Sequence, residues 1–421
     1  MHEDRPSTAP DFLLSRATGS VRTQGARHTF NDADAAISAL RSKDVEMVVG
    51  AIPFDSDTPA ALTVPETIIR EEGPLEPHAY YRNQSLSSRV VGFDPEPEEH
   101  LRRVEAAIGT IGTSKLEKVV LARAVDIEFP EAIDPRLVAA RLIDLSANRD
   151  GFIADLSPAG RPGAMLVGSS PEVLVKRQDS TVSAFPLAGS SPRRASAAED
   201  HLAGQDLLHS SKDLHEHAFV VEHLRRALTP LCERLDIPDV PQLISTNEMW
   251  HLGTPISGTL KDKELTALEL ALAVHPTPAI CGTPAEAAQA LIETAETDRG
   301  FYAGAVGWCD SSGDGEYMVA IRCAEVAGDG LSARAWAGGG IVGDSDAQAE
   351  LEETPATLRS ILKSLSLLPT RLATSTPTVR WCAPAPSARW RSRRARVTVS
   401  NSRRLCANHS GIASSVDSIS W

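Results

Sequence analysis

The sequence lacks the features that mark a membrane or secreted protein. Its uninterrupted apolar runs, such as residues 270–274, fall far short of the roughly 18 to 20 residues that would span a bilayer. The first residues, MHEDRPSTAP, have neither the basic start nor the apolar run of a secretory signal. The six cysteines are scattered without a CxxC pair, which argues against a disulfide framework and a zinc site. We therefore expect a soluble, cytoplasmic protein with free thiols.

Lysine and acidic residues are nearly absent from the end of the chain. From residue 366 onward there are nine arginines, no lysine and one acid, without hydrophobic periodicity. We expect a folded domain at residues 10–368, a flexible N-terminus at residues 1–9 and a disordered basic tail at residues 369–421. The tail either has no folded role or binds an acidic partner. The formal net charge of −14 disfavours nucleic acid as a general partner.

Apolar content and patterning indicate a mixed fold. Hydrophobic residues make up 42% of the chain, enough for a substantial core. Short apolar runs bounded by turn residues predict strands, and apolar residues at helical spacing predict helices. Because these elements show no regular βαβ alternation, the predicted fold class is α+β. Strands are predicted at residues 119–122, 164–167 and 319–321, and helices at residues 211–228 and 346–365, with a kink or break at Pro355.

Two pairs of acidic residues stand near the starts of these helices. Asp213 and Glu216 lie in SKDLHEH, and Glu350 and Glu353 lie in AELEET. Residues three apart share one helix face, so each pair can present two carboxylates in one direction. Two such faces would build an oxygen-rich site for Mg²⁺. The alternative is ordinary solvated acids, which are favoured near helix N-termini in any case.

Two further ionisable residues flank predicted buried strands. Lys118, in KLEKVVLAR, precedes an apolar run, and a desolvated lysine there can act as a base; alternatively, it reaches solvent at the strand edge. Glu172, in MLVGSSPEVLVKR, could be kept protonated by apolar surroundings and donate a proton, or it could form a salt bridge. Both remain candidates for acid–base chemistry.

Other segments are suited to binding an anion. FPLAGS at residues 185–190 and WAGGGIVG at residues 336–343 offer backbone NH groups without side-chain obstruction, although tight turns use glycines equally. Arg322 falls within the predicted apolar strand of MVAIRCAEV, where a guanidinium is costly unless it pairs with an anion. That anion is either a ligand carboxylate or an internal Asp or Glu.

Taken in order, these segments resemble the chorismate-utilising enzymes, the family of anthranilate synthase component I, aminodeoxychorismate synthase, isochorismate synthase and salicylate synthase. The resemblance covers nearly all of residues 10–365. It implies a single large α+β domain with β-sheets wrapped by helices around a central cavity, and Mg²⁺ bridging protein carboxylates to chorismate. The blocks that carry it are GAIPFD (50–55), KVVLAR (118–123), SSPEVLV (169–175), FPLAGS, SKDLHEH, HPTPAICG (275–282), GAVGWCDSSGDGE (304–316), AIRCA (320–324) and AGGGIV (337–342).

The resemblance also assigns roles to single residues. Glu216 and Glu353 match the family's metal-binding glutamates, with Glu350 and Asp213 supporting them through water. Positions that match the substrate-binding wall of the family are Gly189, Ser190, His275, Ala279, Arg322, Gly338, Gly339 and Gly340.

Lys118 and Glu172 point to one branch of the family. In isochorismate-forming members, a lysine at the first position activates water to attack C2 of the ring, and a glutamate at the second protonates the departing C4 hydroxyl. The aminodeoxychorismate branch typically uses a lysine in a PIKGT block, where this chain has Ala188. The HPTPAICG block also resembles isochorismate synthases more than amine-forming members. The resemblance thus implies conversion of chorismate to isochorismate, which serves siderophore, salicylate or menaquinone synthesis.

Two alternatives stay open. A salicylate synthase would share the same residues and continue by eliminating pyruvate from isochorismate. A non-catalytic binding protein would keep the fold and use the basic tail to engage an acidic partner. No obligatory amidotransferase subunit is expected, and a single self-sufficient domain permits a monomer.

Overall fold

The computed structural model describes residues 9–367, so most of the expected N-terminal segment and the expected tail at 369–421 lie outside the described residues. Ala9, expected to be flexible, is instead buried beside Tyr81 and Leu137. The described residues belong to one compact unit, in agreement with the predicted single domain.

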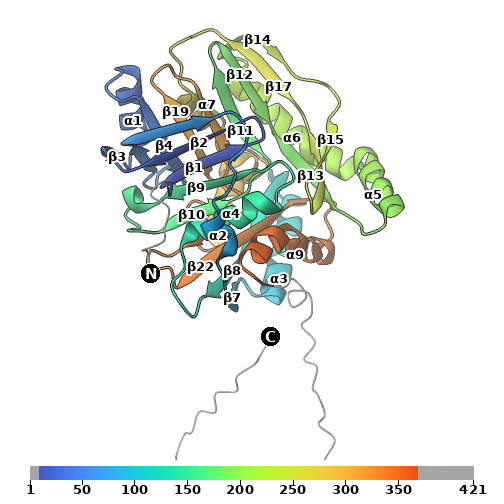
Figure 1. Cartoon of the computed structure of the whole chain (residues 1–421). Coiled ribbons are helices and arrows are strands. Elements are labelled where there is room, and N and C mark those ends of the chain that lie inside the picture. The colour runs from blue at the N-terminus through green and yellow to red at the C-terminus, as the bar shows by residue number, and fades with distance from the viewer. Residues whose placement is uncertain (1–8, 368–421) are drawn as a thin grey trace, which may run out of the picture. The chain divides into compact units, whose positions relative to one another are not determined.

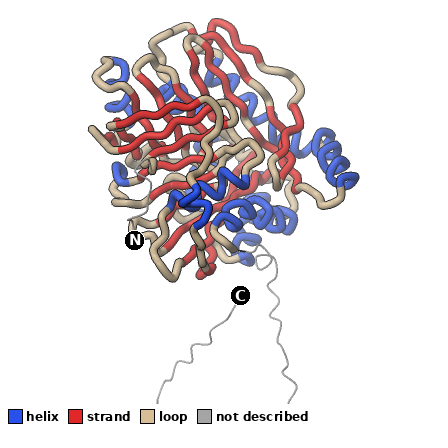
Figure 2. The backbone as a smooth tube through the Cα atoms, in the orientation of Figure 1, coloured by secondary structure: helices blue, strands red, loops and turns tan. Residues whose placement is uncertain are grey.

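Antiparallel strands make up most of the framework (Figures 1 and 2). Within the described residues, a ten-stranded sheet has the order β18-β8-β22-β21-β10-β9-β1-β2-β6, and β7 pairs with β8 as well. These strands are β18 (Gly282–Thr283), β8 (Lys118–Glu128), β22 (Ser332–Val342), β21 (Cys323–Val326), β10 (Met165–Gly168), β9 (Gly151–Asp155), β1 (Phe12–Arg16), β2 (Gly19–Gln24), β6 (Thr67–Glu71) and β7 (Arg89–Asp94).

A second and a third sheet complete the framework. The nine-stranded sheet consists, in spatial order, of β14 (Cys232–Asp236), β17 (Ile256–Leu260), β12 (Thr181–Phe185), β11 (Val173–Gln178), β20 (Gly315–Val319), β19 (Ala305–Asp310), β4 (Met47–Ile52), β5 (Ala61–Val64) and β3 (His28–Phe30). The three-stranded sheet consists of β13 (Leu187–Pro192), β16 (Met249–Gly253) and β15 (Gln242–Ser245). One hydrophobic core joins the two large sheets, since Phe152 and Leu166 of the first share it with Val48 and Met318 of the second.

Helices pack against these sheets. Helix α9 packs on β22 and contacts α3 and α4, while α6 packs on β13 and α7 (Figure 1). The helices are α1 (Ala33–Arg41), α2 (Ala79–Asn83), α3 (Pro97–Ile111), α4 (Pro135–Leu145), α5 (Ala197–His209), α6 (Ser211–Leu228), α7 (Ala267–Val274), α8 (Ala285–Ala295) and α9 (Ala347–Ser364), with a 3₁₀ turn at Ser157–Ala159. Among them, none is both long and apolar enough to cross a membrane.

Local sequence chemistry explains the helices that matter most for the site. The Ser210 side chain accepts a hydrogen bond from Asp213 N at the start of α6, and Asp346 caps α9 in the same way through Ala349 N. The prediction of a helix at residues 211–228 is confirmed. The sequence predicts a kink or break at Pro355. A break is excluded, because α9 is continuous there and buries apolar residues beyond it, which offsets the one lost backbone hydrogen bond; the kink stays a prediction.

The predicted strand around Arg322 is also wrong. β20 ends at Val319 and β21 begins at Cys323, so residues 320–322 form the crossing from the nine-stranded to the ten-stranded sheet. Arg322 has a φ of 53°, in the left-handed region that few non-glycine residues adopt. The apolar residues on both sides are buried because each belongs to a different sheet, which the sequence pattern cannot distinguish from one continuous strand.

The close approach of β4 and β5 yields a stability prediction. Gly50 has a φ of 141°, and a Cβ there would lie 2.0 Å from Ala61 O. We expect Gly50→Ala to lower the free energy of unfolding by at least about 1–3 kcal/mol, the usual cost of overpacking. Gly109→Ala in α3 is the control, since nothing lies within 4 Å of its added Cβ. Chemical denaturation would contradict the prediction if both variants matched the wild type.

Candidate active site

Lys118 is the first residue of β8 and is completely buried. The strand lies between β22 and β18, so the lysine cannot extend into solvent, and the alternative of a solvent-reaching lysine is wrong. Its Nζ lies 3.0 Å from Oε1 of Glu216 on α6, an ion pair that lacks hydrogen-bond geometry. The candidate base and a candidate metal ligand are therefore direct neighbours.

The glycine-rich end of β22 makes this contact possible. Gly340 pairs with Val120 of β8, and a Cβ on Gly340 would lie 2.1 Å from Glu216 Oε1 and 3.1 Å from Lys118 Cε. A Cβ on Gly339 would lie 3.2 Å from Glu350 Oε2, and one on Gly338 would lie 2.9 Å from the Tyr302 hydroxyl. The lack of a side chain at the three glycines lets charged and polar side chains approach β22 closely, while the contact of these glycines with substrate stays a prediction.

Two helices bring the predicted acids together. Glu216 and Glu350 are buried, which excludes ordinary solvated acids at these two positions. The Ser190 hydroxyl donates a 2.6 Å hydrogen bond to Glu353 Oε1, and Lys212 Nζ lies 2.8 Å from Glu350 Oε1. Burial raises the pKa of Glu353 to about 7; the Ser190 bond opposes the rise, whereas the nearby Glu350 and Glu216 charges add to it. Burial likewise raises the pKa of Asp213.

The acid cluster (Asp213, Glu216, Glu350 and Glu353) can be tested against the expected Mg²⁺ by its donor chemistry. Within residues 9–367, no three His, Cys, Asp or Glu side chains form a ready-made metal cage. Mg²⁺, however, typically keeps several waters and takes only one or two carboxylates directly. All side chains of the cluster offer oxygen atoms, and the negative charges of Glu350 and Glu216 raise the pKa of Glu353. Such a concentration of negative charge suits a partly hydrated cation. The residues therefore fit Mg²⁺, and Glu216 and Glu353 are the candidates for direct contact.

Glu172 lies in the connection from β10 to β11 and is only 3% exposed. Burial raises its pKa to about 8, although the Leu187 backbone NH and the Lys118 charge act in the opposite direction. The carboxyl group is therefore mainly protonated at neutral pH. Among the described residues it forms no salt bridge, so the strand-edge ion pair considered from the sequence is wrong.

Arg322 is a buried cation at the sheet crossing, 7% exposed. Its Nη2 lies 3.5 Å from His251 Nε2, and within the described part of the chain no carboxylate comes within ion-pair distance. Burial lowers the pKa of Arg322, whereas Glu248 and Glu353 act to raise it. An internal ion pair is thus ruled out, and the guanidinium suits an anionic ligand.

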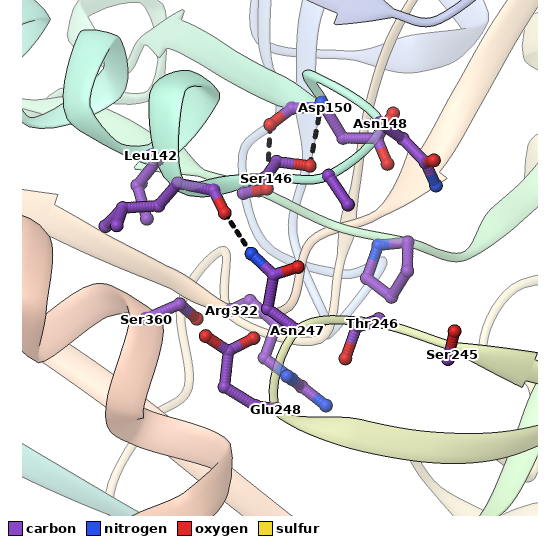
Figure 3. Close-up of a pocket in the computed structure, with 14 residues that line it drawn as sticks. Leu142, Ser146, Asn148, Asp150, Ser245, Thr246, Asn247, Glu248, Arg322 and Ser360 are labelled. Carbon is purple, nitrogen blue, oxygen red and sulfur yellow. Dashed lines mark hydrogen bonds between the residues drawn. The ribbon is translucent and has the colours of Figure 1, made fainter. Parts of the chain in front are cut away.

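Figure 3 shows Arg322 and Glu248 beside a small pocket between the loop at Asn247 and the loop after α4. Its volume of about 40 Å³ holds a few waters and not a substituted ring. A larger open groove of about 480 Å³ is lined by Ser190 and Asp213, together with residues of α5. Of the acid cluster, only Asp213 lines this groove, whereas the pocket in Figure 3 is lined by Arg322.

Strand β13 carries the predicted wall residues Gly189 and Ser190. Gly189 has a φ of 74°, and a Cβ there would lie 3.0 Å from Asp213 Cβ, so the chain needs glycine at this point. His217, which sequence reasoning missed, places Nδ1 3.2 Å from Ala188 O and Nε2 2.7 Å from Thr254 Oγ1. Burial lowers the pKa of His217 to about 4. Its only sequence signal is its position directly after Glu216.

The HPTPAICG block lies along the start of β8, since Gly282 and Thr283 pair with Val119 and Lys118. His275 Nε2 lies within hydrogen-bond distance of the Phe54 backbone carbonyl oxygen, at 3.0 Å. Ala279 is half-buried against the core. The structure thus places the block beside the lysine strand, while substrate contacts of His275 and Ala279 stay predictions.

Comparison with known proteins identifies similar chains. The family pattern described as chorismate binding enzyme matches residues 45–366. MenF of Mycobacterium tuberculosis is 43% identical over 369 residues, covering 85% of this chain and 96% of that protein. The isochorismate synthase DhbC of Bacillus subtilis is 42% identical over 325 residues, covering 76% and 81%. The crystal structure of DhbC from Bacillus anthracis is 36% identical with a TM-score of 0.79, covering 87% of this chain and 98% of that one.

The raised pKa of Glu172 predicts a pH-dependent effect on stability. The folded state holds a proton up to about pH 8 that the unfolded state releases near pH 4.5, so Glu172 stabilises the fold less as pH rises through that interval. Glu172→Gln should therefore gain stability relative to wild type from pH 5 to pH 8, on the order of a few kcal/mol. Thermal melts across this range check it. Exposed Glu286 provides the control variant Glu286→Gln, and equal pH trends in the two variants would refute the assignment.

Proposed function

The chain belongs to the chorismate-binding enzyme family, and on that premise we propose that it is a cytoplasmic, Mg²⁺-dependent isochorismate synthase. The observation that carries this proposal is the burial of two ionisable residues, Lys118 and Glu172; the Lys118 charge acts on the pKa of Glu172, which burial raises to about 8. A base and an acid in one site are what the exchange of two hydroxyl positions requires. Isochorismate would then feed siderophore or menaquinone synthesis.

Lys118 and Glu172 act at different ring positions, Lys118 at C2 and Glu172 at the C4 hydroxyl. The Lys118 amine accepts a proton from water while the water oxygen forms a bond to C2 of the ring. Glu172 gives its proton to the C4 hydroxyl, which leaves as water while the ring double bonds shift. One water enters and one leaves, so the atoms balance and the net reaction is an isomerisation. Glu172 and Lys118 then each need one proton transfer to regain their starting states.

The remaining site residues orient the ring. Arg322 lacks a carboxylate partner in the described chain and is suited to hold one substrate carboxylate. Gly338, Gly339 and Gly340 lack side chains, which lets Tyr302, Glu350 and Glu216 come close to β22, and we propose that their backbone also contacts the substrate. Glu216 and Glu353 would hold Mg²⁺, with Glu350 and Asp213 supporting them, and the bound ion would supply positive charge that neutralises a substrate carboxylate.

The alternatives from the sequence receive less support. The curated relatives are isochorismate synthases, which does not favour the salicylate synthase alternative. The intact acid–base pair and the acid cluster likewise do not favour a non-catalytic binding protein. A salicylate synthase would release pyruvate, so product analysis separates the first alternative directly.

Activity of purified protein with chorismate and MgCl₂ tests the proposed acid and base. We expect isochorismate without pyruvate from the wild type, and rates at least about a hundredfold lower from Lys118→Ala and Glu172→Gln, the usual scale for a general acid or base. Lys115→Ala, at an exposed lysine on the same segment, should match the wild type. Near-full activity in either site variant would reject its role, and stoichiometric pyruvate would favour the salicylate synthase.

The metal proposal has its own test. Chelation with EDTA should abolish activity, and added MgCl₂ should restore it. Glu216→Gln and Glu353→Gln should each weaken Mg²⁺ binding at least tenfold in calorimetric titration, in line with the loss of a carboxylate ligand. Glu352→Gln, at the exposed neighbour on α9, is the matched control. Unchanged activity after exhaustive chelation would remove the metal from the proposal.

A further inference from the structure

One edge of β8 is covered by two different strands with a gap between them. β18 pairs with Lys118 and Val119, and β7 pairs from Ala124 onward. Backbone groups of an antiparallel strand alternate between its two edges, so Val120 and Ala122 direct theirs into this gap. The Val120 NH donates to Cys281 O at 2.7 Å, but its carbonyl and the Ala122 NH meet no strand. Unpaired backbone groups inside a protein are costly.

Two side chains from the segment after α8 occupy the gap. Arg299 donates from Nη2 to Val120 O at 2.8 Å and from Nη1 to Ile280 O at 2.8 Å. Glu296 Oε1 accepts the Ala122 NH at 2.7 Å. The two side chains also form a bidentate ion pair, with Arg299 Nε and Nη2 at 2.8 and 2.7 Å from the Glu296 oxygens. A guanidinium and a carboxylate thus take the place of a strand.

The pair is buried and packed on aromatic rings. The side chains of Arg299 and Glu296 are 2% and 6% exposed. The guanidinium lies 4.6 Å from the ring centroid of Phe54, whose backbone carbonyl also meets His275 Nε2. Arg299 therefore forms hydrogen bonds with β8 and with Ile280 of the HPTPAICG block. It also packs on Phe54, whose carbonyl contacts His275 at the start of that block.

We propose that the Glu296–Arg299 pair is a positioning device that sets Lys118 for its role as base. It completes the edge of β8 two residues beyond Lys118 and fixes Ile280 of the neighbouring wall to the same strand. The side chains of Lys118, Val120 and Ala122 lie on one face of β8, so a displacement at Val120 moves the lysine amine relative to Glu172. This inference rests on the proposed function.

Arg299→Lys tests the pair, because it keeps the positive charge but removes the several donors of the guanidinium group. Arg299→Lys cannot reach Val120 O, Ile280 O and Glu296 at once. We expect kcat for isochorismate formation to fall at least tenfold while KM changes less than about threefold, because the binding groups stay in place. Glu296→Gln, which keeps an acceptor for the Ala122 NH, should lose less activity than Glu296→Ala.

The matched control is Arg177→Lys in the other large sheet. Arg177 is equally buried and joins Ser312 O, Lys263 O and Asp314 in the same manner, away from Lys118. It should lose thermal stability yet keep kcat. All assays are run where circular dichroism shows every variant folded. A kcat of Arg299→Lys within twofold of wild type, or an equal loss in Arg177→Lys, overturns the proposal.

Hydrogen exchange separates this inference from the proposed function. Amides of residues 118–124 should exchange faster in Arg299→Lys than in wild type and Arg177→Lys. If the wild type forms no isochorismate, the proposed function fails, and the exchange measurement still decides whether the pair holds β8. Unchanged exchange in Arg299→Lys contradicts the positioning role in either case.

Discussion

The site depends on the burial of Lys118 against Glu216. Removing a lysine from water costs several kcal/mol unless a partner offsets the loss, and the partner comes from a helix distant in sequence. The approach requires that β22 carry glycine at position 340, because any Cβ would meet the Glu216 carboxylate. This one contact therefore joins strand β8, strand β22 and helix α6, and it places the Lys118 amino group in the buried interior.

Environment gives the carboxyl groups of this site different properties. Glu172 is buried and accepts a hydrogen bond from the Leu187 backbone NH, and burial raises its pKa to about 8. Burial raises the pKa of Glu353 to about 7, and the hydrogen bond from the Ser190 hydroxyl opposes this rise. Both are glutamates with the same reference pKa. The protonated acid suits proton donation, whereas the Glu216–Glu353 region suits a cation, so one site holds two kinds of carboxyl chemistry.

The two large sheets share a core, and the chain crosses between them at the residue that is best suited to bind an anion. Arg322 occupies a left-handed backbone conformation in that crossing, and the strands on both sides are buried. A surface arginine would be compensated by water. At the crossing, the guanidinium lies in the interior near His251, without a carboxylate of the described residues in ion-pair contact.

The sequence by itself determined the chemistry-bearing segments: the helix at 211–228 with its acids on one face, the buried strand behind Lys118, and the blocks that resemble chorismate-utilising enzymes. The sequence could not place Arg322, because an apolar run has the same pattern whether it stays in one sheet or passes between two. It also gave no sign of the Glu296–Arg299 pair. Only the tertiary structure decided which acids are buried and which groups meet. The physical reason is that pKa and pairing depend on contacts between distant segments, such as Ser190 with Glu353, 163 residues apart, whereas periodicity reports only local faces.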